Sequence, residues 1–322
     1  MAEKLKYRFP GQQIIEKTGQ FNLWDSQKDV QGFIVGDFKL DNLYIFEEAG
    51  NLPDNEELFF QETPPIISSK EEYLKTANNL IYSLKSDQLQ KVVFSRIQKV
   101  DFDESKVYDF FLQLTVAYPN AMVYLISSKH FGTWIGATPE ILLSQTGKNT
   151  STIALAGTKK VDDISDWGKK EIEEQFFVSQ FITKKLTSNK LNIISKNGPF
   201  DFSAGPVKHL KTDITFQLKD HSIEQVIKIL HPTPAVSGTP QLEAINHIES
   251  NELHKRELYS GIIGTIYPEN SLVYVNLRCC QIFNGAAYLY LGGGFTKDSI
   301  PEHEWDETEN KSKTLLNILQ NL

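Results

Sequence analysis

The sequence predicts an α+β fold with large antiparallel sheets. Segments typical of strands come in groups and do not alternate regularly with segments typical of helices, which argues against a doubly wound parallel sheet. The chain has 322 residues, of which 40% are hydrophobic and 23% are charged. This composition is ordinary for a globular protein, and a chain of this length can bury a substantial core.

The N-terminal part is predicted to contain short strands and then a helix. Residues 1–50 mix short apolar runs with turns, and the Pro- and acid-rich stretch Leu52–Pro65 is typical of a loop. Apolar residues at helical spacing predict a helix over Ser69–Leu84, and β-branched residues predict a strand over Lys91–Ile97. The next predicted elements are a helix over Asp109–Ala117, a strand over Met122–Ser127, a hairpin over Gly132–Ser144 and a strand over Thr152–Leu155.

The rest of the chain begins with a long helix, predicted over Asp166–Leu186. The apolar positions that recur at helical spacing there are Ile172, Phe176, Phe177 and Phe181. The elements predicted after it are helices over His221–Leu230 and Gln241–Ile248, strands over Gly261–Tyr267, Leu272–Phe283 and Ala287–Leu291, and a final helix over Pro301–Leu319.

The charge and the cysteine content exclude several classes of protein. The formal net charge is -8, whereas proteins that bind nucleic acids or anionic membranes present a basic face. The two cysteines, Cys279 and Cys280, are adjacent, which excludes a disulfide framework and a CxxC metal site. The N-terminal residues lack the apolar region of a secretory signal, and no run approaches the roughly 18 apolar residues of a membrane span. We therefore expect a cytoplasmic protein without nucleic-acid or membrane partners.

Acidic residues on the last predicted helix have the spacing of a metal site. Glu304 and Glu307 are three residues apart and Lys311 follows four residues later, so the three side chains share one face of the helix. Two carboxylates placed in this way provide hard oxygen ligands for Mg²⁺, with space for water and a substrate oxygen. The same pattern is also typical of a solvated acidic face with an ion pair.

A second acidic group, on the long helix, consists of Glu171, Glu173 and Glu174. Glu173 shares a face with Phe177, and a carboxylate that points inward beside aromatic rings needs a cation or a hydrogen-bond partner. A metal ion shared between Glu173 and Glu307 would provide that partner. The alternative is that all three glutamates are exposed charges.

Two further features indicate the binding of an anion. Arg278 lies among apolar residues in the strand predicted over Leu272–Phe283, where its guanidinium can bind a carboxylate or form a structural ion pair. Gly292, Gly293 and Gly294 follow the next predicted strand, and glycines at such a position expose backbone N–H groups to an anion. They do not form a dinucleotide-binding G-x-G-x-x-G motif.

Lys91 and Glu140 are candidates for acid–base chemistry. Lys91 opens a predicted strand, and a lysine in an apolar, partly dry site can lose its proton and act as a general base. Glu140 lies at the start of a strand, where partial burial would raise its pKa and allow it to act as a general acid. Either side chain can instead be a strand-edge charge that faces water.

Taken together, these segments resemble the chorismate-utilising enzymes, which include isochorismate synthases, salicylate synthases, anthranilate synthase large subunits and aminodeoxychorismate synthases. The matching stretches occur in the family's order within residues 88–322, whereas residues 1–87 match poorly. They are Lys91–Arg96, Gly136–Leu143, Leu155–Thr158, His231–Gly238, Arg256–Gly264, Asn276–Cys279, Leu291–Gly294 and Glu304–Lys311. The resemblance implies a single α+β domain in which two large antiparallel sheets pack together, with helices outside and the active site in a cleft beside the sheets.

Two stretches resemble isochorismate synthases in particular. Lys91 occupies the position at which isochorismate and salicylate synthases carry a lysine that activates water, whereas anthranilate synthases carry glutamine there. The segment His231–Gly238 looks like the isochorismate synthase version. The resemblance therefore implies that the small molecule chorismate is the substrate and is converted to isochorismate with Mg²⁺. Water adds at ring carbon 2, and the 4-hydroxyl leaves.

The resemblance also implies a role for each candidate residue. Lys91 would activate the water, and Glu140 would protonate the departing hydroxyl. Arg278 and the backbone of Gly292–Gly294 would hold the enolpyruvyl carboxylate. The other candidates are Glu173, Glu304 and Glu307 for Mg²⁺, and Gly157, Thr158, Ala235 and Lys311 for the substrate.

One position departs from the family pattern and leaves the metal ligand on the long helix open. The family often has an acidic residue three positions before that ligand, and Lys170 stands there if the ligand is Glu173. Glu171 or Glu174 can therefore be the ligand instead.

Alternatives also remain for the activity. They are a salicylate synthase, which goes on to eliminate pyruvate, a chorismate-aminating subunit that uses ammonia, and a non-catalytic chorismate binder. We expect a monomer.

Overall fold

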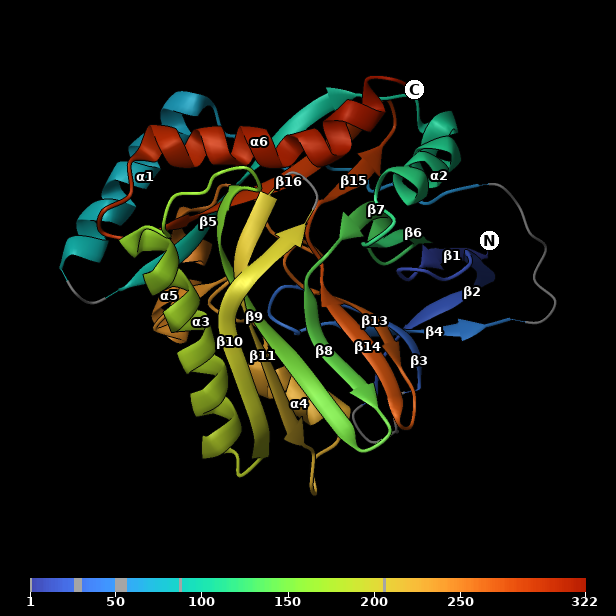
Figure 1. Ribbon diagram of the computed structural model, residues 1–322. Helices are drawn as coiled ribbons and strands as arrows, with labels where there is room; N and C mark the ends of the chain where they lie inside the picture. Colours follow the sequence, from blue (N-terminus) through green and yellow to red (C-terminus); the bar gives the residue numbers. More distant parts are fainter. Residues whose placement is uncertain (1, 26–30, 50–56, 87–88, 205–206) are drawn as a thin grey trace.

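The computed structural model describes residues 2–25, 31–49, 57–86, 89–204 and 207–322 (Figure 1). The helices in these ranges are α1 (Lys70–Lys85), α2 (Val107–Ala117), α3 (Lys169–Ser188), α4 (Ile223–Leu230), α5 (Gln241–Asn251), α6 (Pro301–Leu319) and the short 3₁₀ helix η1 (Glu104–Lys106). The strands are β1 (Glu3–Arg8), β2 (Ile15–Leu23), β3 (Gly32–Gly36), β4 (Leu43–Glu48), β5 (Lys91–Asp101), β6 (Met122–Ser128), β7 (Gly132–Thr138), β8 (Ile141–Thr146), β9 (Asn149–Lys160), β10 (Asn192–Ala204), β11 (Val207–Gln217), β12 (Gly238–Thr239), β13 (Ile262–Ile266), β14 (Asn270–Val275), β15 (Cys279–Phe283) and β16 (Ala286–Phe295).

The described strands form one antiparallel sheet that folds back on itself. Their order is β10-β11-β9-β8-β14-β13-β3-β4-β2-β1-β6-β7-β15-β16-β5-β12. We call the strands from β10 to β3 in this order the first arm, and those from β6 to β12 the second arm. A single apolar cluster includes Phe33 and Ile263 from the first arm and Trp134 and Tyr290 from the second. Burial of this cluster between the arms stabilises the fold.

The α+β class and the antiparallel pairing are thereby confirmed. The two packed sheets that the sequence led us to expect are the two arms of the continuous sheet, connected through β4, β2 and β1. No helix in the described ranges combines the length and the apolar character needed to cross a membrane.

Helices cover the outer faces of both arms. Val178 of α3 and Val226 of α4 share an apolar cluster with strands of the first arm, and Phe110 of α2 and Leu315 of α6 share another with strands of the second. Figure 1 shows α6 along the top of the molecule with α1 beside it, and α6 also contacts β16. The acidic C-terminal helix is therefore held against the glycine-containing strand.

Two predicted elements are wrong because the chain crosses between the arms there. The hairpin expected over Gly132–Ser144 does not form, since β7 belongs to the second arm and β8 to the first. The single strand expected over Leu272–Phe283 is interrupted between β14 and β15. Arg278 in this interruption has a φ of 51°, a left-handed conformation that a continuous strand does not contain.

The two crossings lie side by side and are joined by backbone hydrogen bonds. Ala137 N–H donates to Arg278 O at 3.0 Å, and Val275 N–H donates to Glu140 O at 2.9 Å. The acidic and the basic candidate are thus placed together although 138 positions separate them in the sequence (278 − 140).

Other elements differ less. The strands β10 and β11 were not expected from the sequence, whereas each expected helix is present within a few residues of its predicted bounds. Gly292–Gly294 lie inside β16, opposite Val93–Ser95 of β5, so the expectation that these glycines follow a strand is wrong. Of the loop expected over Leu52–Pro65, residues 52–56 lie outside the described residues and the remainder is irregular.

Candidate active site

A pocket is lined by residues of both arms, next to the crossings. β5 and β16 of the second arm contribute to its wall, as do β9 and β11 of the first arm and the helices α3 and α6. Its empty volume, including the open mouth, is about 860 Å³. The candidate residues that line it are Lys91, Glu140, Gly157, Ala235, Arg278, Gly292, Gly294, Glu307 and Lys311.

Lys91 is held inside this pocket by the sheet. It begins β5, which pairs with β16 on one side and with β12 on the other, and the residue is only 3% exposed. Gly294 on β16 leaves room for the lysine, because a Cβ at Gly294 would lie 3.2 Å from Lys91 Cε. Lys91 is therefore not a strand-edge charge that faces water.

Glu140 lies in the turn between β7 and β8 and combines burial with nearby cations. Burial raises its pKa to about 7, although Lys91, Lys311 and Arg278 each act to lower it. A large fraction of this carboxyl is consequently protonated near neutral pH. That protonation state is the one a general acid requires.

The pocket brings basic and acidic side chains together. Arg278 Nη1 donates to Lys311 O at 3.3 Å, and Lys311 Nζ donates to Gly292 O at 2.8 Å. Arg278 and Lys311 thus place two cationic side chains in a pocket that also contains Lys91 and the carboxyl groups of Glu140, Glu174 and Glu307. Each of the two cations can bind a negatively charged group of a ligand.

The two acidic residues of α6 are in different environments. Burial tends to raise the pKa of Glu307, but Lys311, which is 2.5 Å away, and then Lys170 and Arg278 lower it to about 2. Glu304 is 1% exposed and does not line the pocket, and its Oε1 lies 2.7 Å from Lys170 Nζ. Burial raises the pKa of Glu304, although Lys170 opposes this effect.

Of the three candidate metal ligands on the long helix, the structure places Glu174, and not Glu173, in the pocket. The Glu173 side chain is 41% exposed, lies 3.7 Å from Lys169 Nζ and does not line the pocket, whereas Glu174 does. One residue along a helix turns the side chain by about 100°, which explains the difference. Among the described residues, no three His, Cys, Asp or Glu side chains are grouped closely enough to hold a metal ion as they stand.

Three other candidates are placed as follows. Gly293 faces α6, because a Cβ there would lie 3.3 Å from Glu304 Oε2. Gly157 has a φ of +70° and a Cβ there would lie 2.9 Å from the Cβ of Glu171, so this position requires glycine. Thr158 follows in β9, and its side chain lies outside the described part of the structure.

Sequence reasoning missed several pocket residues, which are Val93, Leu155, Ala156, His209, Val236, Tyr259, Leu277, Tyr290 and Leu291. Tyr259 and Tyr290 stack with ring centroids 5.6 Å apart. Tyr259 lies in the matched stretch Arg256–Gly264, and this position could have identified it from the sequence. His209 Nδ1 lies 2.9 Å from Gly157 O, and burial lowers the pKa of His209. His209 gave no signal because β11 was not expected.

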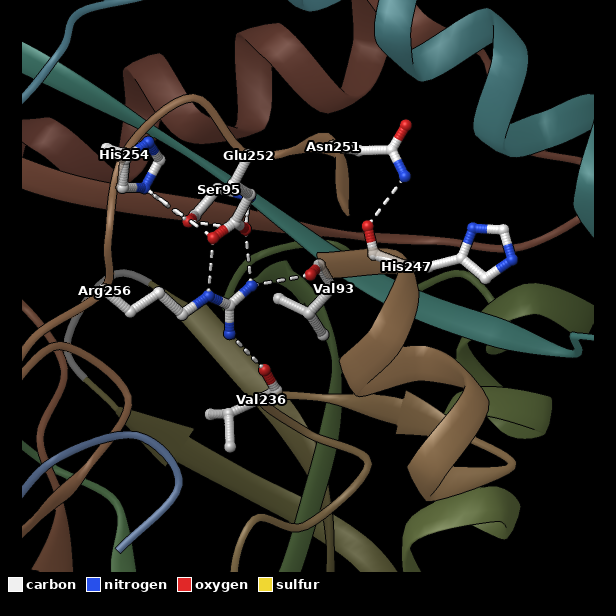
Figure 2. A network of polar contacts seen from close by, with 8 residues as sticks. All are labelled: Val93, Ser95, Val236, His247, Asn251, Glu252, His254 and Arg256. Atoms are coloured by element: carbon white, nitrogen blue, oxygen red, sulfur yellow. Dashed lines mark hydrogen bonds and ion pairs between the residues drawn. The ribbon is translucent and has the colours of Figure 1, made fainter. Parts of the chain in front are cut away.

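A buried polar network joins three segments that form the pocket (Figure 2). Arg256 donates to both carboxylate oxygens of Glu252, at 2.9 and 2.6 Å, and to the carbonyl oxygens of Val236 and Val93, at 2.7 and 2.8 Å. Glu252 also accepts from the N–H and the hydroxyl of Ser95, both at 2.7 Å. The network therefore fixes the position of β5, which carries Lys91, relative to the segment that carries Val236.

Comparisons with known proteins identify the family. The sequence profile described as "Chorismate binding enzyme" matches residues 40–320. Isochorismate synthase MenF of Bacillus subtilis (strain 168) is 30% identical over 298 residues, which cover 87% of this chain and 62% of that protein. Anthranilate synthase component 1 of Lactococcus lactis subsp. lactis (strain IL1403) is 26% identical over 270 residues, which cover 78% of this chain and 57% of that protein.

A solved structure has the same fold. The structure of MenF, the menaquinone-specific isochorismate synthase from Escherichia coli, superposes with a TM-score of 0.81 at 19% identity, covering 99% of this chain and 89% of that chain. The chain belongs to the chorismate-binding enzymes, and it has their fold. It spans less than two thirds of the length of the two curated relatives named above.

We expect Arg256→Met to destabilise the protein strongly. Removal of one partner of a buried ion pair leaves the other charge uncompensated and typically costs about 3–5 kcal/mol. The two side chains are 3% and 2% exposed. Urea unfolding of the variant measures this cost.

Lys39→Met is the matched control for Arg256→Met. It removes a cation from the exposed pair with Glu249, which is 2.7 Å long, and exposed pairs are worth about 0.2–1 kcal/mol. Equal losses for the two variants would show that the Arg256 network does not stabilise the fold.

We expect Glu140→Gln to stabilise the protein more at pH 8 than at pH 5. The pKa of Glu140 rises from 4.5 to about 7 on folding, so the folded state binds more protons between these values. Stability must then fall as the pH rises through this window, and glutamine removes that fall. The test is to measure the melting temperatures of wild type and Glu140→Gln at pH 5 and at pH 8. The prediction is contradicted if the difference between the two proteins is the same at both pH values.

Proposed function

We propose that this chain is an isochorismate synthase that converts chorismate to isochorismate with Mg²⁺. The observation that carries the proposal is that Lys91 and Glu140 line one pocket together with Arg278 and Lys311. A candidate base, a candidate acid and cations for an anionic substrate therefore meet at one place, which is what this reaction requires.

Chorismate carries two carboxylates, and the pocket offers a separate partner for each. Arg278 would hold the enolpyruvyl carboxylate, assisted by the backbone of β16. The pairing of β15 with β16 ends at Leu289 in the described chain, so β15 does not cover the edge of β16 at Gly292–Gly294. The ring carboxylate would lie toward the acidic residues of α3 and α6, with the Gly157 backbone beside it.

Glu174, Glu304 and Glu307 would hold Mg²⁺. Glu304 Oε2 is buried and has no hydrogen-bond partner among the described residues, and an orphaned carboxylate oxygen is a fitting ligand for a hard cation. When bound, the metal ion would supply positive charge to the ring carboxylate. Lys170 lies beside two of these carboxylates, 2.7 Å from Glu304 Oε1 and 3.9 Å from Glu174 Oε1.

The proton transfers are assigned to the two residues at the centre of the pocket. Lys91, acting as the general base, takes a proton from the water that forms the new bond to ring carbon 2. Glu140, in its protonated form, gives a proton to the 4-hydroxyl, which leaves as water while the ring double bonds shift. One water enters and one leaves, so the reaction is an isomerisation. The pKa of about 7 for Glu140 keeps a proton available near neutral pH.

Product analysis tests the proposal directly. Purified protein is incubated with chorismate, with and without Mg²⁺ and with and without ammonium, and the products are separated by chromatography. Isochorismate that forms only with Mg²⁺ is the expected result. Salicylate would identify a salicylate synthase, an ammonium-dependent aminated product would identify an aminating subunit, and unchanged chorismate would contradict any catalytic role.

We expect Lys91→Ala and Glu140→Ala each to abolish turnover and to leave the fold intact. A general acid or base typically contributes about 10²–10⁴-fold to the rate. Steady-state rates and circular dichroism are measured for both variants. Lys313→Ala and Glu302→Ala, which alter exposed residues of α6, are the matched controls and should keep the wild-type rate. A near wild-type rate for either pocket variant would refute the role assigned to that residue.

A further inference from the structure

A lysine amine lies within the group of carboxylates that joins α3 to α6. Lys170 Nζ is 2.7 Å from Glu304 Oε1 and 3.9 Å from Glu174 Oε1. Glu307 also acts electrostatically on Lys170. Lys170 is thus the cation shared by Glu304 and Glu174, and it adds to the positive charge that Glu307 receives from Lys311.

Glu304 depends on this amine for charge compensation. The residue is 1% exposed, and its Oε1 accepts hydrogen bonds from Lys170 and from Ser299 Oγ, the latter at 2.8 Å. Its Oε2 is buried, has no hydrogen-bond partner among the described residues and points toward Gly293, where a Cβ would lie 3.3 Å away. A buried carboxylate that is only partly satisfied is costly without a cation nearby.

The Lys170 amine can also move away from the carboxylates. The Lys170 side chain is 34% exposed, whereas the Glu304 side chain is 2% exposed. A flexible lysine stem can therefore move its amine into solvent without unfolding α3, while the Glu304 carboxylate cannot follow it.

We propose that Lys170 is a tethered counter-cation that occupies the metal position and must leave when Mg²⁺ binds. This inference rests on the Mg²⁺ requirement of the proposed function. Lys170 keeps the carboxylates together and α3 docked on α6 in the metal-free protein. The same positive charge competes with Mg²⁺, so metal affinity is set by an exchange of one cation for another and not by the carboxylates alone.

The test is Mg²⁺ binding to the free protein, measured by titration calorimetry at pH 8 without chorismate. We expect Lys170→Gln to bind Mg²⁺ at least about tenfold more tightly than wild type, because two charges a few ångströms apart interact by more than 1.4 kcal/mol near a protein surface. Lys170→Arg keeps the charge and should not tighten binding. Unchanged or weaker binding by Lys170→Gln overturns the exchange.

Lys169→Gln is the matched control, because it removes the same charge from the neighbouring residue of the helix. The Lys169 side chain is 82% exposed and lies 3.7 Å from Glu173. Because solvent screens an exposed charge, its removal should leave the Mg²⁺ affinity within about twofold of wild type. An equal gain in both variants would show a general charge effect and would overturn the specific role of Lys170.

Thermal unfolding gives a second readout that does not depend on binding. With EDTA, Lys170→Gln should melt at a lower temperature than Lys169→Gln, and Mg²⁺ should restore it. If Lys170→Gln folds only with Mg²⁺, that result also supports the proposal, whereas equal melting temperatures with EDTA contradict it. Absence of Mg²⁺ binding to all variants overturns the exchange. Exchange without isochorismate formation overturns only the proposed activity.

Discussion

The pocket depends on two backbone hydrogen bonds that hold the crossings of the sheet together. They join Ala137 to Arg278 and Val275 to Glu140, at the positions where the chain leaves one arm for the other. Because strands run into each crossing from both arms, neither turn can move without disturbing both halves of the sheet. The side chains of Glu140 and Arg278 are therefore presented to the pocket by backbone that both arms of the sheet hold in place, as a site with positioned groups requires.

Lys91 is placed in the same pocket by strand β5, and a buried polar network holds this strand in position. The strand β5 is the penultimate strand of the second arm and is followed only by the two-residue strand β12. The ion pair of Arg256 with Glu252 compensates for this weak edge, since it binds the backbone of Val93 and Ser95 directly. A buried ion pair contributes little net stability in general, but it requires a single arrangement of the segments that it joins.

Local sequence signals predicted much of this structure, and nonlocal pairing accounts for what they missed. The helix that carries Glu304 and Glu307 is evident because its spacing and its bounds are local properties. The break at Arg278 is not, because β14 and β15 look like one strand until their partners in different arms are known. The sequence could not decide between Glu173 and Glu174, because both glutamates fit a helical pattern and only the packing of α3 against the pocket distinguishes them. His209 could not be proposed, since its strand carried no recognised pattern.

The pocket shifts the pKa values of two of its carboxyl groups in opposite directions, and this difference separates their proposed roles. Glu307 has a cation 2.5 Å away and a pKa of about 2, so it stays ionised and can bind a metal ion. Glu140 is also influenced by Lys311 and Arg278, but within the described residues it forms no ion pair with either. Burial therefore keeps its pKa at about 7. An anionic substrate bound to Arg278 and Lys311 would neutralise the charges that lower the pKa of Glu140. Substrate binding would then raise that pKa further and favour the protonated form of Glu140 that the proposed mechanism uses.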